Sequence, residues 1–111
     1  MKDSSRFWDR IADKYYRSPI KDVEAYEEKL KISRSFFNPD SNVLEFGCGT
    51  GGTAVAHAPY VKHLHAIDVS EKMLEFARTQ ADRKNINNAT FEKASIESFV
   101  APDASFDVIL G

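Results

Sequence analysis

The feature that most constrains this chain is a run of glycines that interrupts an apolar stretch at residues 43–52, Val-Leu-Glu-Phe-Gly-Cys-Gly-Thr-Gly-Gly. The alternating apolar residues before the glycines predict a short buried strand. Glycines permit positive φ angles and the close approach of a ligand, both of which side chains hinder. Residues 53–58 then predict a short helix, whose free N–H groups favour an anionic group such as a carboxylate or a phosphate. The stretch is typical of a strand that runs into a ligand-binding turn.

Glu45 indicates what else the ligand carries. It stands two positions before Gly47, at the carboxyl end of the predicted strand, where open parallel sheets bind their ligands. A carboxylate at this point repels a pyrophosphate and attracts a cation. We therefore expect positive charge on the ligand near Glu45.

The same stretch resembles a motif of a known family. Its pattern E-x-G-x-G-x-G is similar to the first motif of the class I S-adenosylmethionine (SAM)-dependent methyltransferases. The cofactor of that family has an ammonium, a carboxylate and a sulfonium, and leaves as S-adenosylhomocysteine (SAH). The resemblance implies a SAM site whose contacts here include Glu45, Phe46, Gly47, Cys48, Gly49 and Gly51.

A second strand, predicted over residues 62–68, ends in an acid. Asp68 follows Gly51 by about 17 residues, close to the spacing at which a carboxylate reaches a ribose in a strand–helix–strand unit. The alternative is that Asp68 only caps the next helix, which we expect to begin at Ser70 with Met73, Leu74, Ala77 and Ala81 facing inward. Residues 68–77 are similar to the family pattern D-x-S-x-x-M-L-x-x-A, which implies a ribose contact for Asp68 and an adenine contact for Val69. We assign Met73 to the core.

A third strand, predicted near residues 89–92, leads into a loop that holds the adenine edge in the family. Counted back from residues 102–107, the position of the family's adenine-binding aspartate is occupied here by Ser95. A neutral hydroxyl accepts a hydrogen bond more weakly than a carboxylate, so we expect the backbone of Ile96 to carry more of the contact. Glu97 is the other candidate acceptor, although we expect it to be an exposed acid.

The amino-terminal segment predicts two helices. One spans residues 7–16, and its apolar residues Phe7, Trp8 and Ile11 are expected to pack on the sheet. The segment also resembles the W-x-x-I-A-x-x-Y run of many small-molecule methyltransferases, which often folds over the cofactor and would place Tyr15 or Tyr16 against SAM. A second helix is expected to begin near Asp22, with inward residues Val23, Tyr26, Leu30 and Phe37.

These elements predict an α/β fold: a Rossmann-like, doubly wound parallel sheet of the class I methyltransferase type, preceded by two helices and truncated after a fourth strand near residues 105–111. We divide the chain into a helical lid or cap, residues 1–38, and a SAM-binding Rossmann-like half-domain, residues 39–111. The fourth strand leaves an open edge. We therefore expect either a fragment of a longer methyltransferase or a homodimer in which two copies pair at this edge.

The amino-acid composition limits the classes of molecule that the chain is expected to bind. The formal net charge of −2 and the mixture of both signs argue against nucleic acid and an anionic membrane, so we expect a small-molecule acceptor. The chain has neither a membrane-length apolar run nor a signal-peptide core, which predicts a cytoplasmic protein. Cys48 is the single cysteine and is expected to be a packing residue, and His57, His63 and His65 lack catalytic or metal spacing, so no metal is expected.

The function implied by the resemblance is methyl transfer from SAM to an acceptor that the sequence does not identify. No catalytic base can be named. One alternative is a nicotinamide dinucleotide-binding domain of an oxidoreductase, because Gly47, Gly49 and Gly52 also satisfy G-x-G-x-x-G and Asp68 suits a ribose. The other is a module that binds SAM without catalysis.

Overall fold

Four parallel strands form one sheet in the order β3-β2-β1-β4, in a computed structural model that describes residues 5–17, 23–95, 97, 99 and 106–111. The side chains of residues 15–17 lie outside this description. The strands are β1 (Asn42–Phe46), β2 (His63–Asp68), β3 (Ala89–Lys93) and β4 (Val108–Leu110). Phe46 pairs with Ile67 and Asp68 pairs with Lys93, so these strands finish at a common edge. The order confirms the Rossmann-like α/β prediction and creates a crevice beyond the ends of β1 and β4.

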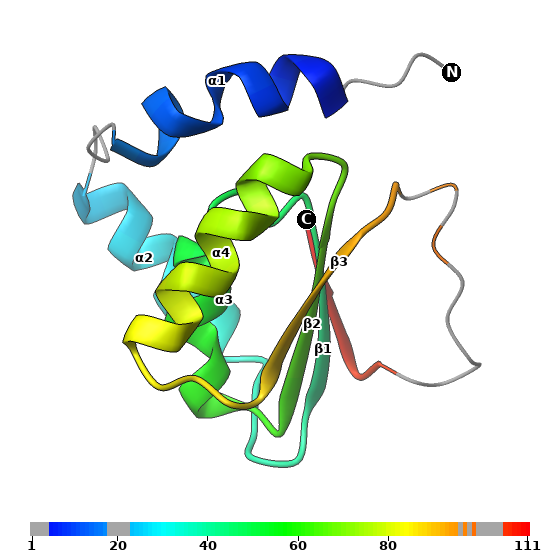
Figure 1. Ribbon diagram of the computed structural model, residues 1–111. Coiled ribbons are helices and arrows are strands. Elements are labelled where there is room, and N and C mark those ends of the chain that lie inside the picture. Colours follow the sequence, from blue (N-terminus) through cyan, green and yellow to red (C-terminus); the bar gives the residue numbers. More distant parts are fainter. Residues whose placement is uncertain (1–4, 18–22, 96, 98, 100–105) are drawn as a thin grey trace.

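Helices cover one face of this sheet and one end of it. They are α1 (Ser5–Arg17), α2 (Val23–Arg34), α3 (Gly52–His57), the short 3-10 helix η1 (Ala58–Tyr60) and α4 (Glu71–Arg83). Figure 1 shows α2, α3 and α4 on the same face, whereas α1 crosses the end of the molecule at which the strands finish. The second helical layer of a doubly wound sheet stays a prediction for this chain.

The core lies between the sheet and these helices. Strand alternation turns Val43, Leu64 and Ala66 toward the helices, where they pack with Leu74 of α4 and Ala54 of α3. Burial of each such leucine contributes about 2 kcal/mol to folding. The predicted inward face of α4 is confirmed, since the residues buried on that helix are Met73, Leu74, Ala77 and Ala81. Ser70 is its N-cap, as predicted, and its hydroxyl accepts a hydrogen bond from the Met73 N–H at 3.1 Å.

The amino-terminal helices pack differently from the prediction. Leu30 is buried and Tyr26 reaches α3, where its hydroxyl is hydrogen-bonded to Thr53 at 3.0 Å. Val23, however, was predicted to face inward and is 59% exposed. The prediction that Phe7 and Trp8 pack on the sheet is also wrong, because both are exposed and α1 rests on α4. The buried residue at the middle of α1 is Ala12.

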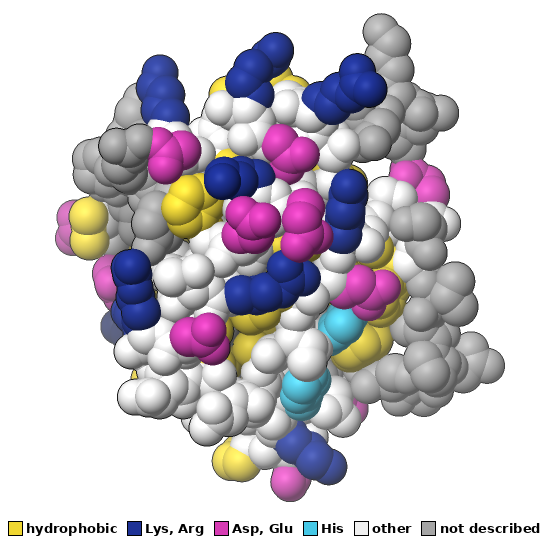
Figure 2. Space-filling model, viewed as in Figure 1, with side chains coloured by type: hydrophobic (Ala, Val, Ile, Leu, Met, Phe, Trp, Pro, Cys, Tyr) yellow, Lys and Arg dark blue, Asp and Glu magenta, His cyan; other side chains and the backbone are white. Residues whose placement is uncertain are grey.

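The surface over α4 carries charges of both signs. Figure 2 shows Lys and Arg side chains interspersed with Asp and Glu across this view of the molecule. Two ion pairs on α4 contribute to the mixture, Arg78 with Glu71 at 2.7 Å and Lys72 with Glu75 at 3.7 Å. Within the described ranges, none of the helices is long and apolar enough to cross a membrane.

Candidate functional site

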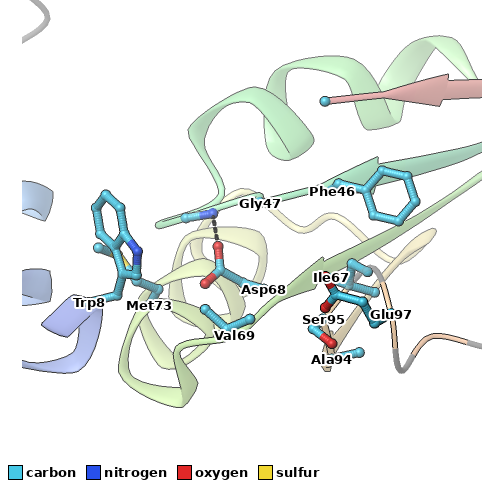
Figure 3. Close-up of a pocket in the computed structure, with 12 residues that line it drawn as sticks. Trp8, Phe46, Gly47, Ile67, Asp68, Val69, Met73, Ala94, Ser95 and Glu97 are labelled. Atoms are coloured by element: carbon cyan, nitrogen blue, oxygen red, sulfur yellow. Dashed lines mark hydrogen bonds between the residues drawn. The ribbon is translucent and has the colours of Figure 1, made fainter. Parts of the chain in front are cut away.

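A cavity of about 500 Å³ opens at the edge where the strands finish. Residues at the ends of all four strands line it: Phe46 closes β1, Asp68 closes β2, Ala94 and Ser95 follow β3, and Gly111 follows β4. Figure 3 shows Trp8 and Met73 on one side of the cavity, with Phe46, Ile67 and the residues after β3 on the other. The topology therefore brings segments from across the sequence to one ligand-sized space.

The glycine turn forms the floor of this space. Gly47, Gly49 and Gly51 have φ angles of +62°, +56° and +85°, which side chains rarely adopt. A Cβ built on Gly47 meets nothing within 4 Å, so a ligand can approach its backbone closely. A Cβ built on Gly51 would lie 2.7 Å from the Ala77 Cβ, so Gly51 is required by the contact between the turn and α4. The glycines of one motif thus serve two purposes.

Asp68 connects the glycine turn to the next helix. Its Oδ2 accepts a hydrogen bond from the Gly49 N–H at 2.8 Å, and its Oδ1 accepts one from the Ser70 N–H at 2.9 Å. Each carboxylate oxygen has lone pairs for a second donor. Asp68 therefore shapes the turn and the start of α4 while it lines the cavity, so the ribose and helix-capping interpretations are compatible in this structure.

Glu45 is buried in β1, next to the wall residue Phe46, and is not itself part of the cavity wall. It is 5% exposed and shares the helix-covered face of β1 with Val43. Burial raises the pKa of Glu45 to about 7, with the Asp68 carboxylate adding to the rise and the Lys29 ammonium opposing it. Its Oε1 has no hydrogen-bond partner among the described residues. A buried acid with an unsatisfied oxygen beside a cavity is suited to a cationic ligand group.

Cys48 does not supply a nucleophile. It is buried in the core cluster with Val43 and Ala54, which confirms the packing role. Burial raises the pKa of the Cys48 thiol, and the carboxylates of Glu45 and Asp68 raise it further. The thiolate, which is the reactive form of cysteine, is therefore disfavoured.

The predicted site residues fall into three groups. The structure brings six of them to the cavity wall: Phe46, Gly47, Gly49, Asp68, Val69 and Ser95. Three others do not line the cavity: Glu45 and Cys48 are buried, and Gly51 is held against Ala77 of α4. Ile96 and the side chains of Tyr15 and Tyr16 lie outside the described residues, so their cofactor contacts stay predictions.

The cavity wall also includes residues that the sequence did not point to as ligand contacts: Trp8, Ile67, Met73, Ala94 and Gly111. Met73 was assigned to the core, and it is both fully buried and part of the cavity wall. Trp8 belongs to the segment that resembles a cofactor lid, so the resemblance indicated the right helix but a different residue. Glu97 is an exposed acid, as expected, at the margin of the cavity. In the described part of the chain, the ionisable side chains include no group of three that could hold a metal ion.

Comparisons with known proteins agree with this geometry. Residues 43–111 match a family model described as a methyltransferase domain. An uncharacterized methyltransferase of Bacillus subtilis, YcgJ, is 34% identical over 94 residues, which are 85% of this chain and 37% of that protein. A phosphoethanolamine N-methyltransferase of Caenorhabditis elegans is 31% identical over 76% of this chain and 20% of its own length. An uncharacterized RNA methyltransferase of Listeria innocua is 23% identical over 78% of this chain and 18% of its own length.

Solved structures show the same arrangement of elements. The crystal structure of YcgJ superposes with a TM-score of 0.71 at 33% identity and covers 75% of this chain and 36% of that one. NodS, an N-methyltransferase of Bradyrhizobium japonicum in complex with SAH, superposes with a TM-score of 0.79 over 97% of this chain and 55% of its own. Its 23% identity makes it evidence for the fold alone. The chain thus spans little more than a third of the length of YcgJ.

Proposed function

Because this chain belongs to the class I SAM-dependent methyltransferases, we propose that its cavity binds SAM and presents the methyl group to an acceptor. The observation that carries the proposal is that the glycine turn, Asp68 and Glu45 come together at one edge of the sheet, where the Glu45 Oε1 has no hydrogen-bond partner among the described residues. The bound cofactor supplies an electrophilic methyl group on its sulfonium. The role of this chain is to bind and orient that donor.

The described residues fit the parts of the cofactor. The open approach to Gly47 suits the amino-acid part, and the remaining lone pairs of Asp68 suit ribose hydroxyls. Glu45, with its pKa near 7, gains a partner when a cationic ammonium approaches. Val69, Ile67 and Ser95 provide the apolar and polar wall against which an adenine would lie. The wall thus offers a different chemical group to each part of SAM.

We propose that the methyl acceptor is a small molecule. The intermixed charges on the face in Figure 2 and the net charge of −2 offer no phosphate-binding surface there. The relatives named above include both an RNA methyltransferase and a phosphoethanolamine methyltransferase, so their names do not decide between the two classes. A screen of methyl transfer from labelled SAM to pooled small molecules and to total RNA tests the assignment, and methylation of RNA alone would contradict it.

The two alternatives differ from this proposal in what they bind and what they catalyse. A nicotinamide dinucleotide would place its pyrophosphate near the buried carboxylate of Glu45, which disfavours it. A module that binds SAM without catalysis would occupy the same cavity but methylate nothing. Retained SAH binding together with the absence of methyl transfer in the screen would favour the module.

The free edge of β4 is the remaining sequence prediction about partners. Among the described strands β4 pairs with β1 alone, and Ile109 on β4 is 61% exposed. We propose that this edge pairs with a further strand, from a second copy or from a longer chain. Sedimentation equilibrium of the chain tests the first case, because a monomer at every concentration would exclude the homodimer.

The cofactor itself is tested by calorimetric titration with SAH and, separately, with NAD. We expect SAH alone to bind, and Asp68→Ala to weaken the binding by about 1–3 kcal/mol because buried ribose hydroxyls lose their acceptor. Asp82→Asn, an exposed carboxylate on α4, is the matched control and should bind like the wild type. NAD binding, or no SAH binding by chain that is folded by circular dichroism, would contradict the proposal.

A further inference from the structure

Among the described side chains of α1, Trp8 is the one that lines the cavity. This indole is 36% exposed and forms part of the cavity wall, near Met73 of α4 (Figure 3). Its neighbour Phe7 contacts it edge to face at 5.3 Å and is itself 48% exposed. The position of Trp8 therefore depends on what holds α1 in place on α4.

Asp9, the next residue, supplies such a contact. Its Oδ1 accepts a hydrogen bond from the Ser70 hydroxyl and another from the Lys72 N–H, the latter at 3.1 Å. Ser70 is the N-cap of α4 and Lys72 lies in its first turn, where N–H groups lack partners within the helix and the dipole favours a negative charge. Asp9 thus completes the cap that Ser70 begins, although the two residues are 61 positions apart.

The same cap continues into the cavity. The Ser70 N–H donates to Asp68 Oδ1, and Asp68 Oδ2 accepts from the Gly49 N–H. A continuous set of hydrogen bonds therefore runs from Asp9 on α1, through Ser70 and Asp68, to the glycine turn. Asp9 lies at one end of this set and does not line the cavity itself.

We propose that Asp9 is a positioning residue for ligand binding, which holds α1 on the start of α4 and thereby places Trp8 against the bound ligand. The proposal rests on SAM as the ligand, as argued above. It makes affinity depend on a carboxylate that does not contact the ligand. Asp9 acts through Trp8, so removal of the indole makes the carboxylate irrelevant to binding.

The first experiment needs no ligand. Trp8 is the only tryptophan, so acrylamide quenching of its fluorescence reports the docking of α1 alone. Asp9→Ala should raise the quenching constant about twofold, since a released α1 exposes the whole indole. Asp9→Asn keeps one acceptor oxygen and should restore most of the protection. Asp40→Asn, which makes the same charge change in the exposed turn before β1, is the control and should quench like the wild type. Equal quenching constants for wild type and Asp9→Ala would overturn the proposal.

The second experiment is a double-mutant cycle on SAH affinity with Trp8→Ala, Asp9→Ala and the double variant. We expect each single variant to raise the Kd about five- to tenfold, and the double variant to bind as Trp8→Ala does. Independent, multiplying losses would show that Asp9 acts by another route and would overturn the proposal. If the wild type does not bind SAH while the quenching difference persists, the proposed cofactor fails and the anchoring role of Asp9 stands.

Discussion

Glu45 and His57 are two buried ionisable residues at opposite ends of the unit that contains the glycine turn and α3. Glu45 precedes the turn and is 5% exposed, whereas His57 ends α3 and is fully buried. Burial disfavours the charged form of both, so the pKa of Glu45 rises to about 7 and that of His57 falls to about 4. The Arg34 guanidinium adds to the fall for His57.

Their surroundings separate the two residues. His57 packs edge to face on Phe37 at 4.9 Å, and neither ring nitrogen has a partner among the described residues. It does not line the cavity and behaves as an apolar packing residue. Glu45 immediately precedes the wall residue Phe46 and has one oxygen without a partner among the described residues. An unsatisfied group beside a cavity indicates a ligand, while an equally unsatisfied group inside a core indicates packing.

The largest expected effect is the loss of stability that His57 causes in acid. The unfolded histidine titrates near 6.5 and the folded one near 4, so the unfolded state binds more protons in this interval and stability falls with the pH. The loss between pH 7.5 and 4 should be about 3 kcal/mol, from roughly 1.4 kcal/mol per pKa unit. Denaturant unfolding at a series of pH values measures it, and His57→Leu should remove this part of the acid sensitivity. An unchanged pH dependence in His57→Leu would contradict the assignment.

Glu45 should change the stability in the opposite direction with pH, and over a narrower pH interval than His57. Its folded pKa is raised above the unfolded value of 4.5, so its contribution is present below pH 4.5 and is lost as the pH rises through 7. We expect a loss of roughly 2.5 kcal/mol between pH 4.5 and 7. Glu45→Gln keeps the shape without the charge and should abolish this loss, whereas His57→Leu should retain it. If both variants had the same pH profile, the two residues would not differ as argued.

Ligand binding separates the pair further. At pH 7 about half of the Glu45 side chains carry a proton, so an ammonium that requires the carboxylate should release about half a proton per SAH bound. Calorimetry in two buffers of different ionisation enthalpy measures this release. Glu45→Gln should abolish it and weaken binding about tenfold, which is roughly 1.4 kcal/mol. His57→Leu should release protons and bind SAH as the wild type does, and a loss of binding in that variant would remove the distinction.

The sequence predicted the region around these residues because its signals there are local. The buried strand β1, the alternation in the first half of β2, the glycine turn and the Ser70 cap each depend on signals within a few residues, and each is confirmed. What it could not provide were relations across long separations. Gly51 is required by Ala77, and Asp9 caps α4 from the start of the chain. Neither pairing has a signature in the neighbouring sequence.

The packing of the amino-terminal helices was another long-range relation that the sequence did not predict. The apolar spacing of residues 7–16 predicted a helix with an apolar face, and α1 is that helix. The periodicity of apolar residues does not predict which part of the protein the apolar face of the helix packs against. The sheet was the expected partner, but α4 takes that place and leaves Phe7 and Trp8 exposed. For that reason Trp8 was missed as a cavity residue, while the cavity residues that follow β1 and β2 were found.

The smallest effect tests whether burial, and not the residue type, distinguishes His57. His65 on β2 is hydrogen-bonded to two side chains of the neighbouring strand β3. Its Nδ1 lies 2.6 Å from the Thr90 hydroxyl, and its Nε2 lies 2.8 Å from a carboxylate oxygen of Glu92. The side chains of His65 and Glu92 are 21% and 51% exposed, so water screens their interaction. Glu92→Gln should therefore change the free energy of unfolding by less than about 1 kcal/mol at any pH from 5 to 8. If Glu92→Gln changed the free energy of unfolding as much as His57→Leu does, burial would not be what distinguishes His57. Histidine ionisation would then govern the acid stability of this chain wherever it occurs, and the contrast between the buried His57 and the hydrogen-bonded His65 would fail.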